Sequence, residues 1–272
     1  MSTGDLTPLE VSQALDTVIE QKTRRTTAEL ILFGMLAGMY IGFGAIAATT
    51  VLAYGETPAT AVTRLLAGSV FCVGLILVIL PGSELFTGNV LMATGLVNRQ
   101  VPWWQVLRNW TLVYLGNFVG AVLLALAMYG TGLLGTGTSP SEMGQTAAQI
   151  ASTKINMGFG AALLRGVLCN ILVCLAVILA MTARTVTGKI LGIYFPIMVF
   201  VLSGFEHSIA NMYFLPAGLL ASGTFLSGFW SMWWNLIPVT LGNVAGGLVV
   251  ILLHPARAKR LMRSMGETLR GE

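Results

Sequence analysis

Charge is scarce in this chain: only 10% of its 272 residues are Asp, Glu, Lys or Arg, whereas 55% are hydrophobic. That shortage excludes a disordered chain, argues strongly against an ordinary soluble domain and predicts a polytopic membrane protein. Cysteine and histidine are also rare, at three and two residues. The cysteines (Cys72, Cys169 and Cys174) lie inside apolar runs, without the spacing of a disulfide framework or a metal site. We therefore expect no metal and no cofactor.

The first 29 residues lack a long apolar run, so no cleavable signal peptide is expected. The segment Thr7-Pro8-Leu9-Glu10 has the form of a helix start, with a threonine cap, a proline and a glutamate three residues after the cap. The helix that follows carries an apolar stripe of Val11, Leu15, Val18 and Ile19. Residues 1–27 are therefore predicted to form an amphipathic cytoplasmic helix that lies at the membrane surface or covers a mouth of the protein. Anchoring and gating roles both remain open.

Six apolar segments follow, at about 30–53, 62–97, 108–130, 157–182, 189–220 and 229–253. A helix needs roughly 20 residues to span the hydrocarbon. The second and fifth segments are too long for one ordinary span and too short for two, and each carries an acid near its middle, Glu84 and Glu206. A glycine stands just before each acid, at Gly82 and Gly204, where it allows a helix to break. We predict an all-α protein with six transmembrane helices, of which the second and the fifth are broken.

The basic residues set the expected topology. If the N-terminus lies inside, only Arg64 and Lys154 lie on the outer side, and Arg165 falls within the fourth span. All the others are internal, which predicts cytoplasmic N- and C-termini and gives no reason to expect nucleic-acid binding. The domain plan is then a transmembrane domain at 28–254 and a basic cytoplasmic tail at 255–272.

The two halves of the transmembrane domain, about 28–130 and 157–253, resemble each other. The segment 84–89 (ELFTGN) aligns with 206–211 (EHSIAN), and 115–120 (LGNFVG) aligns with 241–246 (LGNVAG) at nearly the same offset. Each half holds three spans, an odd number, so the second copy must be inverted relative to the first. Inverted repeats with one broken helix each are the plan of a transporter or channel, with the pathway at the breaks.

The repeat separates scaffold from chemistry. Glu84 and Asn89 recur as Glu206 and Asn211, so we predict that these four residues support the broken backbone, with the glutamates capping the second half-helices. Direct contact with a substrate is the alternative. His207 replaces Leu85, and Ile209 replaces Thr87, so function is expected in that difference.

His207 is the only intramembrane histidine and stands beside an acid, which favours a functional role in the pathway. Thr87 on the facing loop is a candidate partner for the imidazole or the substrate. Lys154 is either a solvated loop lysine or a charge that draws small anions to the outer mouth. Asn170 is a buried amide that needs a partner and is a candidate to face the pathway. Candidate apolar constrictions, for which simple packing is the alternative, are Phe71, Leu75, Leu85 and Phe200.

Four motifs together resemble the formate/nitrite transporter family: 81–89 (PGSELFTGN), 165–176 (RGVLCNILVCLA), 203–212 (SGFEHSIANM) and 235–243 (NLIPVTLGN). The similarity covers about residues 28–253. It implies an aquaporin-like fold, a homopentamer with one pore per protomer, and a place in the bacterial inner membrane. It also implies that His207 is the central pore histidine, Thr87 its loop partner and Lys154 a vestibule lysine, with Phe71, Leu75, Leu85 and Phe200 at the constrictions.

The expected function is passage of a small monovalent weak-acid anion, with formate favoured over nitrite and hydrosulfide. A bare anion is prohibitive to bury in an apolar constriction, so we expect protonation and passage as the neutral acid. In this hypothesis Lys154 concentrates the anion, and His207 donates either a proton or only a hydrogen bond. A plain anion channel with a protonated His207 is the first alternative. An intramembrane enzyme that uses Glu206 and His207 is the second and weaker one, because Glu84 repeats the glutamate.

Overall fold

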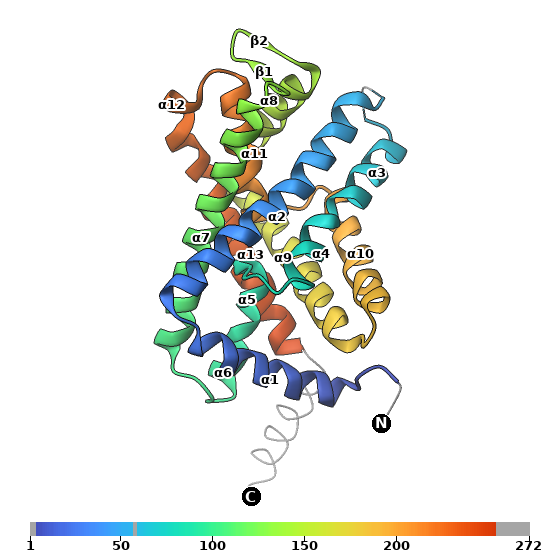
Figure 1. Ribbon diagram of the computed structural model, residues 1–272, viewed down its shortest axis with the longest axis vertical. Helices are drawn as coiled ribbons and strands as arrows, with labels where there is room; N and C mark the ends of the chain where they lie inside the picture. Colours follow the sequence, from blue (N-terminus) through green and yellow to red (C-terminus); the bar gives the residue numbers. More distant parts are fainter. Residues whose placement is uncertain (1–3, 57–58, 254–272) are drawn as a thin grey trace, which may run out of the picture.

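The computed structural model describes residues 4–56 and 59–253, and that part of the chain is almost entirely helical (Figure 1). Helix α1 crosses one end of the molecule, which we call the α1 face, and α8 stands at the other end, the α8 face (Figure 1). A small antiparallel hairpin of β1 (Gly135–Thr136) and β2 (Ser139–Pro140) lies beside α8. The helices are α1 (Pro8–Arg24), α2 (Thr27–Tyr54), α3 (Ala61–Phe71), α4 (Val73–Ile79), α5 (Phe86–Asn89), η1 (Val90–Met92), α6 (Ala93–Val97), α7 (Trp103–Gly130), α8 (Glu142–Ile155), α9 (Phe159–Thr182), α10 (Val186–Leu202), α11 (Ser208–Ala221), α12 (Phe225–Gly228), η2 (Phe229–Met232) and α13 (Trp233–Leu253).

Five stretches of the described chain are long and apolar enough to cross a membrane. These are Thr27–Tyr54, Ala61–Ile79, Trp103–Gly130, Phe159–Thr182 and Phe225–Leu253. The remaining predicted span consists of α10 and α11, which are each too short on their own. The fifth predicted helix is thus broken between Leu202 and Ser208, and the second between Ile79 and Phe86. Both breaks lie at the predicted positions.

Both breaks contain a glycine whose backbone conformation is unfavourable for other residues. Gly82 has φ +88° and Gly204 has φ +69°, values in the left-handed region that side chains with a Cβ disfavour. Each glycine lies two residues before the glutamate of its repeat, so the chain leaves the helix in the same way in both halves. The predicted role of these glycines is confirmed.

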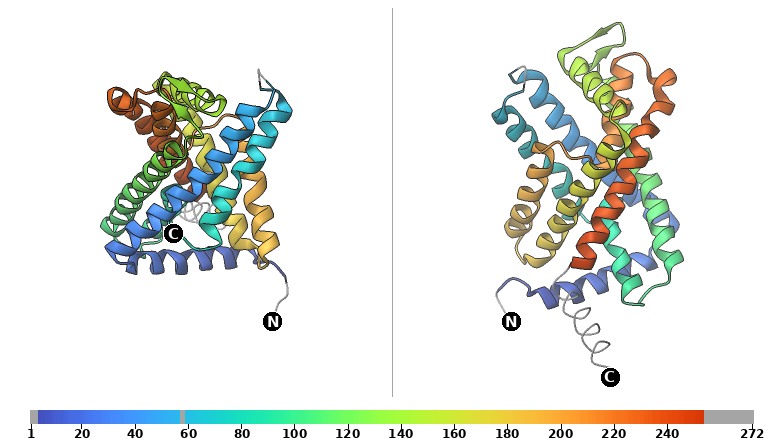
Figure 2. Two further views of the ribbon diagram at one scale, coloured as in Figure 1. Left: turned by 45° about the horizontal axis from the view of Figure 1, so that its top comes forward. Right: turned by 180° about the vertical axis from the view of Figure 1, so that it is seen from behind.

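The two halves also pack alike, because α2 lies against α7 and α9 lies against α13 with glycines at the contacts (Figures 1 and 2). A Cβ on Gly120 would lie 2.0 Å from the Met35 carbonyl oxygen, and a Cβ on Gly246 would lie 2.2 Å from the Val167 carbonyl oxygen. No side chain fits there, so each pair of helices is held at backbone contact. These matched pairs are the tertiary counterpart of the repeat seen in the sequence.

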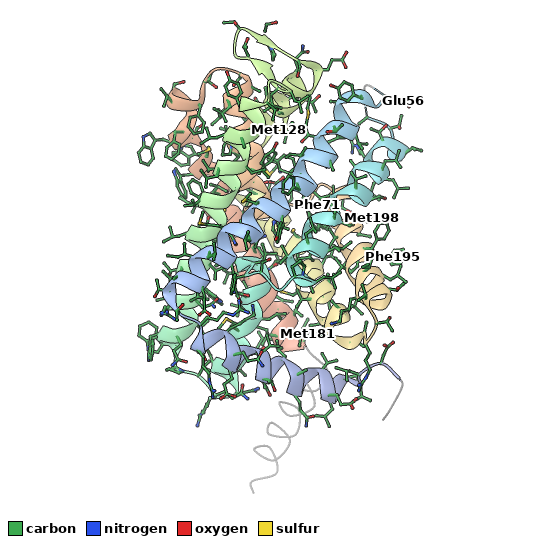
Figure 3. The ribbon with its side chains drawn as sticks, in the orientation of Figure 1. Glu56, Phe71, Met128, Met181, Phe195 and Met198 are labelled. Carbon is green, nitrogen blue, oxygen red and sulfur yellow. The ribbon has the colours of Figure 1, made fainter. Side chains whose placement is uncertain are left out.

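The sides of the bundle expose large apolar side chains, as in a protein surrounded by lipid. Phe195 on α10 is 57% exposed and points away from the bundle (Figure 3). Exposed tryptophans stand near the helix starts at both ends of the bundle: Trp103 and Trp104 at the start of α7, and Trp230 and Trp234 around the start of α13. Such aromatic residues are typical of membrane–water boundaries.

Helix α1 begins as predicted, with a capping box in which Thr7 and Glu10 exchange hydrogen bonds. The bonds that Glu10 accepts from the Thr7 backbone N–H and hydroxyl keep the pKa of its carboxyl below the ordinary value. The predicted stripe faces inward, since Val11 and Ile19 are buried. The helix lies across the ends of α6, α7 and α9 (Figure 2), and the Leu6 N–H donates to the Thr182 carbonyl at 2.9 Å. The predicted basic tail lies outside the described residues.

Candidate functional site

The break nearer the α1 face is organised around Glu84, which is fully buried. Lys22 Nζ donates to Glu84 Oε2 at 2.7 Å, and Arg25 Nη1 lies 2.7 Å from Glu84 Oε1. Asn89 Nδ2 donates to Oε2 at 2.5 Å. Burial lowers the pKa of the Lys22 ammonium, and the attraction of the Glu84 carboxylate opposes that fall. Two cations and an amide thus hold one carboxylate inside the protein.

The break nearer the α8 face repeats this arrangement around Glu206. Lys154, in the last turn of α8, donates to both carboxylate oxygens at 2.8 Å. Asn211 Nδ2 donates to Glu206 Oε2 at 2.7 Å, as Asn89 does in the other half. The side chains of both glutamates are therefore bonded to the asparagine of their own break and to a lysine from α1 or α8.

A second pair of asparagines satisfies the backbone at the breaks. Asn117 Nδ2 donates to the carbonyls of Glu84 and Gly34, and Asn117 Oδ1 accepts from the Phe86 N–H. Asn243 makes the equivalent bonds to Glu206, Gly166 and Ser208 in the other half. This role of the two asparagines is not apparent from the sequence, although both belong to the aligned segments 115–120 and 241–246. The pairing of Lys22 and Arg25 with Glu84 is likewise not apparent from the sequence.

The prediction that the glutamates cap the second half-helices is wrong. The N-cap position of α11 is His207, whose Nδ1 accepts from the Ala210 N–H at 3.0 Å. The carboxylate oxygens of Glu206 are bonded to Lys154 and Asn211 instead. The side chain that caps is thus the one that differs between the repeats, since α5 has no side-chain cap at Leu85.

His207 is 3% exposed and uses both ring nitrogens. Because Nδ1 accepts a backbone N–H, the neutral ring carries its proton on Nε2. Nε2 lies 2.9 Å from Thr87 Oγ1, so Nε2–H donates to the hydroxyl oxygen. The structure therefore brings together the two residues that the sequence placed on facing loops. The hydroxyl proton of Thr87 remains available, because no acceptor for it is found among the residues that the structure describes.

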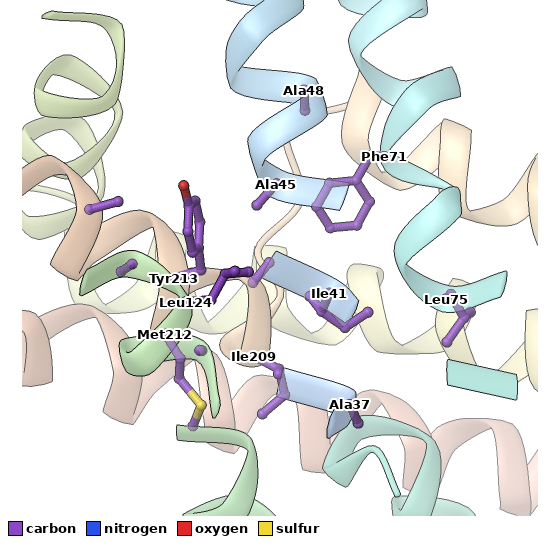
Figure 4. Packing of buried hydrophobic residues seen from close by; sticks show 14 of the residues in the cluster. Ala37, Ile41, Ala45, Ala48, Phe71, Leu75, Leu124, Ile209, Met212 and Tyr213 are labelled. Carbon is purple, nitrogen blue, oxygen red and sulfur yellow. The ribbon is translucent and has the colours of Figure 1, made fainter. Parts of the chain in front are cut away.

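Two of the predicted constriction residues, Phe200 and Phe71, pack beside this pair. The Phe200 ring stacks on the His207 imidazole with centroids 5.9 Å apart, and Phe71 meets Phe200 edge-on at 5.5 Å. Leu75 lies one helical turn beyond Phe71 toward the α1 face (Figure 4). Phe71, Phe200, Leu75 and Leu85 are all buried. The polar pair thus has buried aromatic side chains directly beside it.

A cavity of about 90 Å³ lies between this centre and α1. Leu75, Leu85 and Asn89 line it on one side, and Ile19 and Lys22 of α1 line it on the other. Helix α1 therefore covers a cavity whose opposite wall includes Leu75 and Leu85, two of the candidate constriction residues.

The side chains of Asn170 and Lys154 both bond to residues in or next to the two breaks. Asn170 Nδ2 donates to the carbonyls of Thr87 and Asn243, and its Oδ1 is buried without a partner in the described part of the chain. Lys154 is 14% exposed and paired with Glu206, so it is not a solvated loop lysine. Its Nζ also lies 5.4 Å from the centre of the Phe214 ring.

Comparisons with known proteins point to one family of transport proteins. A model of the family "Formate/nitrite transporter" matches residues 9–256. The chain is 39% identical to a probable formate transporter of Methanothermobacter thermautotrophicus, over 92% of this chain and 96% of that protein. It is 34% identical to the formate channel FocA of Haemophilus influenzae, over 92% and 94% of the two chains. Among solved structures, a pentameric formate channel with formate bound is similar, with a TM-score of 0.72 and 36% identity, over 83% of this chain and 94% of that one.

Proposed function

The chain belongs to the formate/nitrite transporter family, with its aquaporin-like fold, and we propose that it passes a small monovalent weak-acid anion, formate before nitrite or hydrosulfide. The observation that carries the proposal is the buried His207–Thr87 pair, on which the Phe200 ring stacks and beside which Phe71 packs against Phe200. Such a centre offers hydrogen bonds to a small polar solute and excludes bulk water. The family consists of transporters, so an enzymatic reaction is not proposed.

Passage as the neutral acid fits the apolar constrictions. A bare carboxylate would lose its hydration there, whereas protonation at one mouth and release of the proton at the other removes that penalty. Two further polar atoms in this region, Asn170 Oδ1 and Ser208 Oγ, are buried without described partners and are suited to bond a neutral acid or water.

His207 serves in this proposal as a hydrogen-bond donor and not as the proton source. A neutral imidazole that gave away its Nε2 proton would become an imidazolate, so net donation requires an imidazolium. Protonation of Nδ1 would break the bond that this atom accepts from Ala210 at the start of α11. The same bond disfavours the plain anion channel, which needs a protonated His207.

Lys154 acts differently from the sequence-based expectation in this proposal. Glu206 neutralises its charge at 2.8 Å, so the pair attracts a distant anion weakly. We assign to Lys154 the support of the α8-face break, with attraction of the anion as a smaller effect.

The wider organisation of the protein is also part of the proposal. Formate channels among the relatives and a pentameric structural neighbour support a homopentamer with a pore in each protomer. We place the α1 face and both termini in the cytoplasm of a bacterium, with the six spans of residues 28–254 in its inner membrane and residues 255–272 as a basic tail. The strong bias of Lys and Arg toward that side supports this orientation.

Uptake into proteoliposomes tests the function. Formate, nitrite, hydrosulfide and acetate are offered over a range of external pH, with internal pH recorded by an enclosed dye. We expect formate to enter fastest, and each formate that enters to bring one proton. Formate flux that is unchanged on acidifying one side, or a formate current without proton movement, would contradict neutral-acid passage.

Two variants test the histidine. His207→Asn keeps a side-chain acceptor for the start of α11 but loses the ring, whereas His207→Ala loses both. We expect both variants to lose formate flux, and His207→Asn to keep the thermal stability of the wild type. Full flux in His207→Asn would refute the assignment of the imidazole as the donor.

A further inference from the structure

Arg165 is an exposed cation inside a membrane span. It lies six residues after the start of α9, and its side chain is exposed on the surface of the protomer. Its carbonyl oxygen accepts from the Glu206 N–H at 3.3 Å. Its guanidinium has no hydrogen bond and no ion pair with the residues that the structure describes. The five donors of this group are therefore left for something outside the protomer.

The inverted repeat shows that the fold does not need this charge. Phe33 occupies the equivalent place in the first half, where its carbonyl accepts from the Glu84 N–H at 3.2 Å. The break uses only the backbone of this position, and either side chain is compatible with it. The Phe33 ring is covered by Arg25, whose guanidinium carbon lies 4.8 Å from the ring centre. No described ring or ion pair covers Arg165 in the same way.

The surroundings of Arg165 are apolar. Leu164 and Leu168 on α9 are 62% and 46% exposed, and Leu241 on α13 is 52% exposed. A Cβ on Gly166 would lie 3.2 Å from Gly242 Cα, so Arg165 is level with this part of α13. Gly242 lies eight residues after Trp234, which places Arg165 roughly 10 Å deeper than that exposed tryptophan. An unsolvated charge at such a depth is unfavourable unless it finds an acceptor.

A second copy of this chain does not offer a carboxylate at that depth. Within the described spans, the acids near their middles are Glu84 and Glu206, which are buried and already paired. The exposed acids toward the α8 face are Glu56 and Glu142, which line a polar recess of about 920 Å³ together with Arg64. Glu56 stands at the rim of the molecule in Figure 3. An ion pair between neighbouring protomers is therefore not the natural partner.

We propose that Arg165 binds the phosphate of a phospholipid in the leaflet at the α8 face, one lipid for each protomer. A helical side chain tilts toward the N-terminus of its helix, and for α9 that direction leads to the α8 face. The long arginine side chain can extend along the apolar surface and raise its guanidinium to the phosphate level. The planar group then donates two parallel hydrogen bonds to phosphate oxygens. The lipid chains would cover the exposed leucines of α9 and α13. This proposal does not depend on which anion the channel passes.

Native mass spectrometry of the detergent-purified protein tests the site. The wild type, Arg165→Gln, Arg165→Lys and the control Arg64→Gln are titrated with phosphatidylglycerol, and a phosphate-free galactolipid with the same acyl chains is titrated in parallel. Arg64→Gln removes the same charge on the same side of the protein, but from the polar recess.

We expect Arg165→Gln to lose one tightly bound phosphatidylglycerol per protomer, with about fivefold weaker binding. Arg165→Lys should retain part of the affinity for phosphatidylglycerol, and Arg64→Gln should bind this lipid as tightly as the wild type. The galactolipid should not distinguish the four proteins. Equal phosphatidylglycerol occupancy in the wild type and Arg165→Gln overturns the proposal. So does a parallel loss of galactolipid, or dissociation of the oligomer at unchanged lipid occupancy, which would indicate a contact between protomers. If Arg165→Gln does not fold, equal wild-type affinity for the two lipids overturns it.

Discussion

The breaks at Glu84 and Glu206 are built from the same parts but differ at two points. Each holds a buried glutamate with a lysine and an asparagine, and each uses a second asparagine to bond the backbone. The Glu84 break has Arg25 as an additional cation, and the Glu206 break has His207 where the other has Leu85. The residues that both breaks share form hydrogen bonds with backbone groups that the broken helices leave free. The residues that differ form the polar centre, at His207, and the attachment of α1, at Arg25.

The source of the cations also differs. Lys22 and Arg25 come from α1 and the residue that follows it, whereas Lys154 comes from α8, between the two halves. The Glu84 break thus depends on the docking of a helix that covers the cavity beneath it. Variants that make one break resemble the other can separate the contribution of the additional cation from that of the histidine.

The largest effect is expected from the glutamates. Glu84→Gln leaves two partly buried cations without a carboxylate, and loss of a buried partner costs on the order of 3–5 kcal/mol. Glu206→Gln leaves one cation, Lys154, and should destabilise the protein less. Thermal and denaturant unfolding of the purified proteins measure both. A Glu206→Gln protein that is less stable than Glu84→Gln would show that the extra cation does not matter.

The next effect concerns the histidine. His207→Leu gives the second break the residue of the first, and it removes one preorganised donor from the polar centre. We expect formate flux to fall by about 10²-fold, the scale for loss of such a donor. The double variant Leu85→His/His207→Leu should not recover flux, because Thr87 has no counterpart at Ile209. Recovery would mean that either break can hold the donor.

A smaller effect is expected from Arg25. Arg25→Gln makes the cation count of the two breaks equal, and Glu84 keeps Lys22 and Asn89. The loss of one charged contact corresponds to about 1–2 kcal/mol. Hydrogen exchange of the α1 amides should become faster, because this helix loses one of its attachments. Arg24→Gln is the matched control, since Arg24 is 76% exposed and, among the residues that the structure describes, pairs with Glu20 alone. Equal exchange in the two variants would contradict the role of Arg25.

The smallest effect is expected from Thr87. Thr87→Val keeps the shape of the side chain but removes the acceptor at 2.9 Å from His207 Nε2. Loss of one hydrogen bond of about 1 kcal/mol predicts a roughly fivefold lower formate flux. Thr87→Ser should keep most of the flux. If Thr87→Val transports like the wild type, the hydroxyl does not position the imidazole during passage.

Much of the fold could be predicted from the sequence. Apolar segment lengths with an acid in their middle indicated two broken helices, and Gly82 and Gly204 indicated where the chain turns. The alignment of Glu84 with Glu206 indicated the inverted repeat and separated His207 from the scaffold. These features depend on composition and spacing along the chain, which a sequence displays directly.

The partners of each charged group were accessible only from the folded chain. Lys22 and Glu84 are 62 positions apart, and Lys154 and Glu206 are 52 apart, so no local pattern links them. Hydropathy and spacing identify what a residue must satisfy, namely a buried charge or a broken helix. Which group satisfies it depends on how α1, α8 and the two breaks pack. For that reason the sequence alone pointed to His207 as the distinctive residue, whereas the fold assigned its Nδ1 to the start of α11 and its Nε2 to Thr87.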